Sequence, residues 1–200
     1  TASNGKIAAM LKRGDLEDNA GATLMLHDVT GVAAERVLVV SLGKKEDFGD
    51  RSARDALNSI AKVLAGSNAT DAVVCLSDTT MPNRSMASRV QLATRVLADG
   101  AYKFDAPKQK KSAKVRGVKK VTIVVPKVDP ALEAAVRNGM AIAAGMAVTK
   151  DLGNLGGNVA NPGYLASTAQ SLGKEFGFTV EVLERADMEK LGMGSLLAVG

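Results

Sequence analysis

Short apolar runs that alternate with helical periods are the feature that most constrains how this 200-residue chain can fold. Three runs, residues 36–42, 71–77 and 121–125, are rich in valine, leucine and isoleucine. Continuous apolar runs of this length are typical of strands that are covered on both faces. A fourth run, residues 23–27, is joined to the first by a polar loop containing Gly31, and we expect these two runs to form a hairpin.

Two segments between these strands have the spacing of amphipathic helices, residues 52–65 and 85–98. The apolar positions on one face are Ala53, Leu57, Ile60 and Leu64 in the first segment and Met86, Val90, Ala93 and Leu97 in the second. Ser52 with Asp55 resembles a capping box at the start of the first helix, and Gly66 can end it. Because strands and helices alternate, the sequence predicts an α/β domain with a mostly parallel sheet between layers of helices.

A third helix is predicted to begin at Asp129, an N-cap residue followed by Pro130, and to extend to about Asp151. Its alanine and glycine content allows close packing, although each interior glycine costs about 1 kcal/mol of helix stability. We interpret this helix as a buried connector.

A new β/α unit follows the glycine-rich stretch at residues 153–158. Asn161 and Pro162 begin a helix that Gly177 ends, residues 178–183 predict a strand, and residues 187–191 predict a short helix. We therefore expect three parts: an N-terminal α/β domain at 1–128, a connector at 129–152, and the start of a second α/β domain at 153–200.

Positive charge is concentrated in one segment, residues 103–120, which carries a net charge of +7. Because the whole chain carries +5, the remaining residues sum to −2. The basic residues of the segment are Lys103, Lys108, Lys110, Lys111, Lys114, Arg116, Lys119 and Lys120. Such a run can bind phosphates of a nucleic acid, or it can be a solvated loop that aids solubility. The sequence leaves both interpretations open.

Composition excludes several classes of protein. A single cysteine, Cys75, excludes an internal disulfide framework, and a single histidine, His27, excludes the usual zinc motifs. The longest apolar run, residues 140–148, is far shorter than the roughly 20 residues that span a bilayer. Residues 1–6 are polar and lack a secretory core, so we expect a cytoplasmic protein without membrane contact.

The sequence gives little evidence for catalytic residues. The glycines at 153–157 follow a helix instead of a strand, which does not fit a dinucleotide fingerprint and instead suggests a loop with unusual backbone angles. His27 and Asp28 are neighbours on a strand and point to opposite faces. Cys75 lies among apolar residues and is expected to be a buried, inert thiol. The acidic groups around residues 15–18, 46–50 and 181–189 fit solvated surfaces, so we predict no catalytic and no metal-binding residue in this stretch.

Several motifs resemble the leucyl aminopeptidase (cytosol aminopeptidase) family. The most specific are Asn161-Pro-Gly-Tyr-Leu-Ala166 and Leu191-Gly-Met-Gly-Ser-Leu-Leu-Ala-Val-Gly200. Further matches are Leu11–Asp15, Gly21–His27, Glu35–Lys44, Gly139–Gly145 and Lys150–Asn154 together with Asn158 and Val180–Leu183. This chain has Asn154-Leu-Gly-Gly-Asn158 where the family usually has two prolines, which loosens that loop.

The resemblance implies a three-layer, macro-domain-like N-terminal domain joined by a long helix to a catalytic domain that removes N-terminal residues, leucine preferred, from peptides. It also implies a homo-hexamer, and two divalent metals, zinc or manganese, whose ligands lie beyond Gly200. Because the family begins with a further strand, we expect the chain to be an excerpt that lacks its first strand. These residues alone are expected to be inactive.

Two alternatives remain open. One is a stand-alone module that binds ADP-ribose or a related nucleotide, although no glycine cluster follows a core strand. The other is DNA binding, which the resemblance to some bacterial members of the family implies, through the basic segment. Its contacts would be Lys108, Lys110, Lys111, Lys114, Arg116, Lys119 and Lys120.

Overall fold

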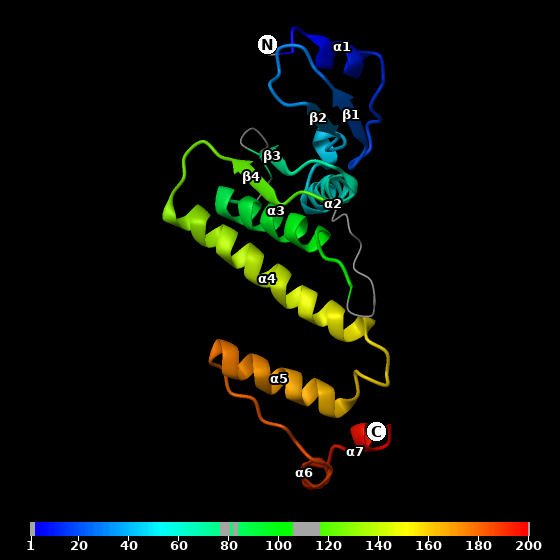
Figure 1. Ribbon diagram of the computed structural model, residues 1–200, viewed down its shortest axis with the longest axis vertical. Coiled ribbons are helices and arrows are strands. Elements are labelled where there is room, and N and C mark those ends of the chain that lie inside the picture. Colours follow the sequence, from blue (N-terminus) through cyan, green and yellow to red (C-terminus); the bar gives the residue numbers. More distant parts are fainter. Residues whose placement is uncertain (1–2, 77–80, 82–83, 106–116, 200) are drawn as a thin grey trace. The chain divides into compact units, whose positions relative to one another are not determined.

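A computed structural model describes residues 3–76, 81, 84–105 and 117–199 (Figure 1). The chain divides into two compact units, the N-terminal unit Thr1–Val148 and the C-terminal unit Thr149–Gly200. Within the described residues no helix combines the length and apolarity needed to cross a membrane.

The predicted hairpin is confirmed. Strand β1 (Thr23–His27) pairs antiparallel with β2 (Arg36–Val40), with Leu24 opposite Val39. Asp28 turns the chain with a φ of 48°, and its N–H donates to Glu35 O at 3.0 Å. A short helix, α1 (Lys6–Lys12), precedes the hairpin and buries no residue. Because it has no buried face, its sequence lacks the apolar spacing that would predict a helix.

A second pair of strands is parallel: β3 (Asp71–Cys75) and β4 (Lys120–Val124), with Val74 opposite Ile123. The predicted α/β class is confirmed, but in place of one mostly parallel sheet the described strands form two separate two-stranded sheets. Expected coverage on both faces is wrong for β3, because Val73 is 63% exposed and Cys75 is exposed, whereas Val74 is buried.

Helices α2 (Asp50–Gly66) and α3 (Met86–Gly100) confirm the two amphipathic segments. The main core cluster joins them through Leu57 of α2 and Leu92, Ala93 and Val96 of α3, with Ile123 of β4 packed against it. Helix α3 also contacts the long helix α4 (Pro130–Asn154), because Val90 clusters with Leu132 and Ala135. Figure 1 shows α3 running between the β3–β4 pair and α4.

The start of α2 differs from expectation. A 3-10 turn, η1 (Lys45–Asp47), precedes it, and the N-cap is Gly49. Ser52 occupies the third helical position, where its Oγ accepts from Gly49 N–H at 2.8 Å. The predicted capping box of Ser52 and Asp55 is therefore wrong, because the helix begins three residues earlier than the apolar period does. The hydroxyl of Ser85 caps α3 by accepting from Ser88 N–H at 3.2 Å.

Helix α4 begins as predicted, because Asp129 caps it by accepting from Leu132 N–H at 2.8 Å. Its buried positions form one stripe, Leu132, Ala135, Gly139 and Ala143. The opposite side is open, with Met140 52% exposed, so the interpretation as a buried connector is wrong. The helix is buried along one face only, because α3 covers only that face.

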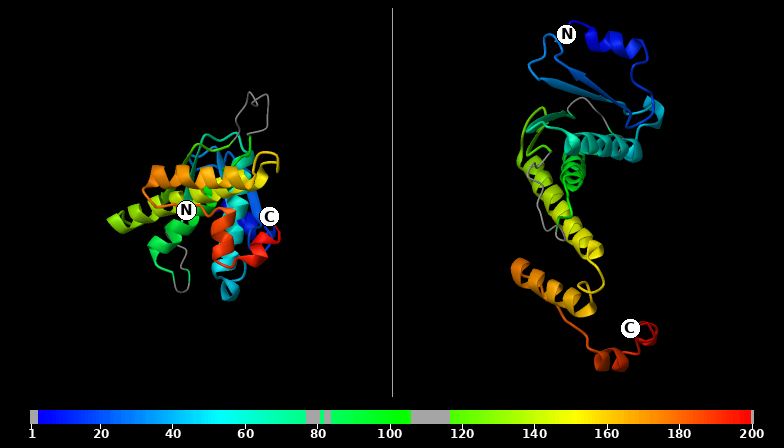
Figure 2. Two further views of the ribbon diagram at one scale, coloured as in Figure 1. Left: turned by 90° about the horizontal axis from the view of Figure 1, so that it is seen from below. Right: turned by 45° about the vertical axis from the view of Figure 1, so that its right-hand side comes forward.

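The C-terminal unit contains α5 (Pro162–Phe176), α6 (Arg185–Lys190) and α7 (Gly194–Leu197). Asn161 caps α5 by accepting from Tyr164 N–H at 3.0 Å, and Gly177 ends it with a φ of 75°. The predicted strand at 178–183 is wrong, because that segment has no strand partner among the described residues. Figure 2 shows it as an extended connection between α5 and α6.

Candidate functional site

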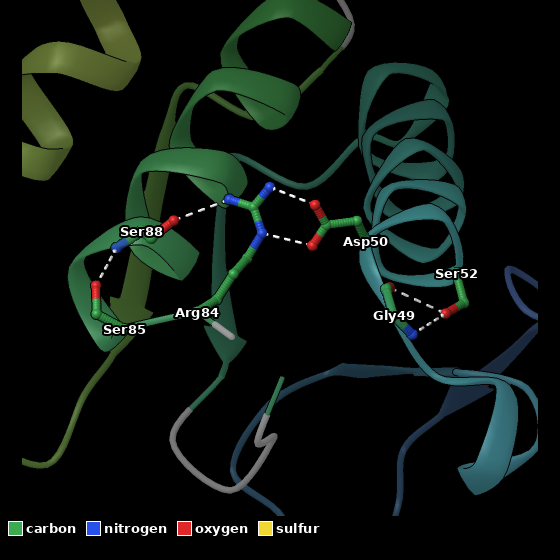
Figure 3. A network of polar contacts seen from close by, with 6 residues as sticks. All are labelled: Gly49, Asp50, Ser52, Arg84, Ser85 and Ser88. Atoms are coloured by element: carbon green, nitrogen blue, oxygen red, sulfur yellow. Dashed lines mark hydrogen bonds and ion pairs between the residues drawn. The ribbon is translucent and has the colours of Figure 1, made fainter. Parts of the chain in front are cut away.

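A network of polar contacts lies where α2 and α3 begin (Figure 3). The Arg84 guanidinium, just before α3, donates to both carboxylate oxygens of Asp50, the first residue of α2, at 2.6 and 2.7 Å. Its third nitrogen donates to Ser88 Oγ at 2.8 Å. This bidentate pair links the start of α2 to the residue just before α3.

Electrostatics in this network favour the charged forms of both partners. The hydrogen bond from Arg84 holds the pKa of Asp50 below its usual value, and the same bond raises the pKa of Arg84. Asp50 also lies at the positive end of the α2 dipole, which favours a carboxylate. Because Arg84 is occupied by three bonds and Asp50 is ionised, the network positions helices and offers no free acid or base.

The basic segment is described only at its ends. Lys103 and Lys120 reach solvent there, and Lys119 is exposed beside Lys120. The other predicted contacts, Lys108, Lys110, Lys111, Lys114 and Arg116, lie outside the described residues. Lys103 and Lys119 both line a largely apolar cavity of about 570 Å³ between β4, α3 and α4. The fold therefore brings two cations from opposite ends of the segment to one cavity.

Single-residue candidates do not assemble into a catalytic group. His27 is exposed at the end of β1, and Asp28 lies in the turn beyond it. Cys75 is exposed at the end of β3, so the expectation of a buried thiol is wrong. Its exposure has the same cause as that of Val73, since no described element covers that face of β3.

The glycine-rich stretch does not form a phosphate cradle either. Gly153 belongs to the last turn of α4, and Gly156 O accepts from Val159 N–H at 2.8 Å in the turn that follows. None of Gly153, Gly156 and Gly157 has a positive φ, so the expectation of unusual backbone angles is wrong.

Acidic residues are dispersed. Asp15 accepts from Arg13 at 2.8 Å, and Glu189 pairs with Arg185 at 3.2 Å within α6. The described residues contain no group of three or more histidine, cysteine, aspartate or glutamate side chains that could hold a metal ion. The donor set that a two-metal peptidase needs is therefore not assembled in the described part of this stretch.

Sequence reasoning missed the Asp50–Arg84 pair and a buried hydroxyl. The two residues are 34 positions apart in the sequence, so no local sequence pattern predicts that they pair. Thr94 Oγ1 is buried in α3 without a hydrogen-bond partner among the described residues. A threonine within an apolar helical face is its only sequence signal.

Comparison with protein families gives two consecutive matches. Residues 1–111 match the N-terminal domain of the cytosol aminopeptidase family, and residues 147–200 match its catalytic domain. The probable cytosol aminopeptidase of Azoarcus sp. (strain BH72) is 61% identical over 201 residues, covering 99% of this chain and 40% of the relative. That of Pseudomonas aeruginosa (strain LESB58) is 42% identical over 200 residues, with the same shares. The chain thus spans about 40% of the length of these relatives.

Solved structures share the fold. The bottromycin maturation enzyme BotP in complex with Mn has a TM-score of 0.72 at 22% identity, over 96% of this chain and 39% of BotP. A mutant of tomato leucine aminopeptidase has a TM-score of 0.72 at 19% identity, over 94% of this chain and 37% of that protein. At these identities the likeness establishes the α/β fold.

Proposed function

Because the chain belongs to the cytosol aminopeptidase family, we propose that it is part of a peptidase that releases N-terminal amino acids, with leucine preferred, from peptides. The observation that carries this proposal is the order of the two family matches, N-terminal domain first and catalytic domain second, along one continuous chain. High identity to relatives named as cytosol aminopeptidases supports it.

Residues 1–200 supply scaffold in this proposal. We assign 1–128 to the N-terminal domain, 129–152 to the connecting helix and 153–200 to the start of the catalytic domain. The extent of α4, Pro130–Asn154, supports a helical connection at this place. The scaffold positions the catalytic half and shapes its approach, and it contributes no catalytic residue.

The metals belong to the rest of the protein. We propose two divalent ions, zinc or manganese, bound by residues outside this stretch, because the described residues offer no suitable donor group. When bound, such a pair supplies an activated water and polarises the scissile carbonyl. A solved structural neighbour is in complex with Mn, which makes manganese a sensible first ion to test.

We further propose a cytoplasmic homo-hexamer. The name of the family supports the location, and the assembly rests on the resemblance of the motifs. Light scattering of the full-length protein tests the assembly, and a stable monomer or dimer would exclude it.

Hydrolysis of leucine p-nitroanilide tests the main proposal. The full-length protein should cleave it, lose activity with a chelator and regain it with Mn²⁺ or Zn²⁺. Residues 1–200 alone should show no turnover and no tight uptake of two ions. Turnover by this stretch alone, or a full-length protein that cleaves no leucine substrate with either metal, contradicts the proposal. Calorimetric heat on adding ADP-ribose would favour the nucleotide-binding alternative.

DNA binding is the second candidate, favoured by the +7 charge of residues 103–120. If lysines in this segment neutralise phosphates, affinity for duplex DNA should fall steeply with salt. Substituting Lys119 and Lys120 by alanine should weaken binding, and the salt slope should fall by about one for each lysine that binds a phosphate. Absence of binding at low salt removes this candidate.

A further inference from the structure

The largely apolar cavity of about 570 Å³ between β4, α3 and α4 lies inside the N-terminal unit. Pockets that bind small molecules in proteins have volumes of roughly 300–1,000 Å³. In Figure 1, β4 (green) and α4 (yellow-green) both lie alongside α3. The side chains of Val121 and Ile123 line the cavity from β4, Leu97 lines it from α3, and Val136 and Met140 line it from α4. This lining suits a ligand with an apolar body.

Positive charge lies at one end of this cavity. Lys119 directly precedes β4, Lys103 follows the end of α3, and both are exposed residues that line the cavity. Glu133, the acidic residue among the described lining residues, lies beyond the other end of β4, in the first turn of α4. A strand of this length spans about 17 Å, so the carboxylate is remote from the lysines. Its oxygen also lies 4.0 Å from the Arg137 guanidinium. The lysine end therefore favours an anionic group.

A buried hydroxyl lines the same cavity. Thr94, in the middle of α3, is 8% exposed, and its Oγ1 has no hydrogen-bond partner among the described residues. A threonine within a helix can donate to the carbonyl four residues earlier, but this one does not. The Thr94 methyl group faces α4, because a Cβ at Gly139 would lie 3.1 Å from Thr94 Cγ2. Buried polar groups are nearly always paired in native proteins, so a polar atom of a ligand would satisfy this hydroxyl.

We propose that this cavity binds a hydroxylated fatty acid. The apolar chain lies along β4, the carboxylate lies beside Lys103 and Lys119, and the hydroxyl on the chain pairs with Thr94. A peptide fits less well, because its repeated N–H and C=O groups would meet few polar partners in this lining. A plain hydrocarbon would leave the Thr94 hydroxyl unpaired and would gain nothing from the lysines.

Calorimetric titration of the full-length protein tests the charged end. The probes are decanoate and decylamine, both below the concentrations at which they form micelles. Decanoate should bind, and decylamine, which has the same chain and a cationic head, should bind roughly tenfold more weakly or not at all. Lys119→Ala should weaken decanoate binding roughly threefold to tenfold. Lys120→Ala is the matched control, because Lys120 is the next residue and is not among those that line the cavity.

Three results of this titration overturn the proposal: no binding of decanoate, equal binding of both probes, or equal losses for the two lysine variants. A segment of the same polypeptide that fills the cavity would give the first of these results.

Decanoates hydroxylated at successive carbons test the buried hydroxyl. One isomer should bind roughly fivefold more tightly than decanoate, because it pairs with Thr94 Oγ1. Thr94→Val should abolish this preference and leave the affinity for decanoate unchanged. Because Thr94→Val removes an unpaired buried hydroxyl at nearly constant shape, the variant should fold at least as stably as the native protein.

Thr122→Val is the matched control for the hydroxyl. Thr122 belongs to β4 and is exposed, and it is not among the residues that line the cavity. This variant should keep the preference for the hydroxylated isomer. A series in which no isomer is preferred, or a preference that survives Thr94→Val, overturns the proposal.

Discussion

The two units of this chain stabilise their helices in different ways. In the N-terminal unit, α2, α3, α4 and the strands share clusters of buried apolar residues. In the described C-terminal unit, the one buried residue is Gly173, and Phe176, Phe178 and Leu191 are 68%, 51% and 64% exposed. Capping groups at Asn161 and Gly177 define α5 without any core beneath it.

This difference shows that helix ends can be well formed where the described residues bury few apolar side chains. A helix of 15 residues is marginally stable alone, and packing of an apolar face supplies most helix stability in proteins. We therefore expect the N-terminal unit to respond strongly to changes in its core, whereas the C-terminal unit should respond mainly to local changes.

Truncation of a core leucine should have the largest effect. Leu92 is 6% exposed in the main cluster, and Leu92→Ala should lower the free energy of unfolding by about 2–5 kcal/mol. Leu191→Ala, at a 64% exposed position, should change it by about 0.5 kcal/mol or less. Urea unfolding of the 200-residue chain measures both. Equal losses would show that the contrast between the units is wrong.

Replacing two glycines of α4 by alanine should change stability in opposite directions within one helix. A Cβ at Gly139 would lie 2.8 Å from Thr94 Cβ and 2.9 Å from Gln91 O, so Gly139→Ala should destabilise by about 1–3 kcal/mol. A Cβ at Gly145 meets nothing within 4 Å, so Gly145→Ala should stabilise by up to about 1 kcal/mol. Thermal unfolding distinguishes them, and two stabilising substitutions would mean that α4 does not pack closely on α3.

Features decided within a few residues could be predicted from the sequence. The caps at Asp129 and Asn161 and the stop at Gly177 are correct because one residue and its nearby backbone groups determine each of them. The hairpin is correct for a similar reason, since its two strands follow each other in the chain with only the loop at 28–35 between them.

Features that depend on distant partners could not be predicted. Residues 178–183 have the composition of a strand, but a strand also needs a neighbour. The apolar pattern of β3 predicts two covered faces, and its outer face and edge are open among the described residues. For the candidate site, motifs indicate the family, whereas the pairing of Asp50 with Arg84 depends on how α2 packs against α3.

Removal of helix caps should lower stability by an intermediate amount, and the effect should differ between the two units. Ser85→Ala and Asn161→Ala each remove one capping bond, which costs about 1 kcal/mol. Ser85→Ala should lower the stability of the whole N-terminal unit, because α3 belongs to its core. Asn161→Ala should instead speed amide exchange within α5 and leave α3 unchanged. Faster exchange in α3 after Asn161→Ala would contradict the independence of the units.

The smallest effect should come from the Asp50–Arg84 pair, because both side chains reach solvent, at 53% and 28% exposure. The pKa of Asp50 is lowered by the hydrogen bond from Arg84, so the pair adds stability above the ordinary aspartate pKa of about 3.9. That stability is lost as the pH falls through the lower pKa of the folded state.

Asp50→Asn should therefore be less stable than the native chain at neutral pH and converge with it in acid. As a control, Ser88→Ala removes another acceptor of Arg84 without removing a titrating group. The stability difference between this variant and the native chain should therefore not depend on the ionisation of Asp50. Urea midpoints across this pH range measure both variants, and an Asp50→Asn difference that stays constant into acid would show that the ion pair does not contribute to stability.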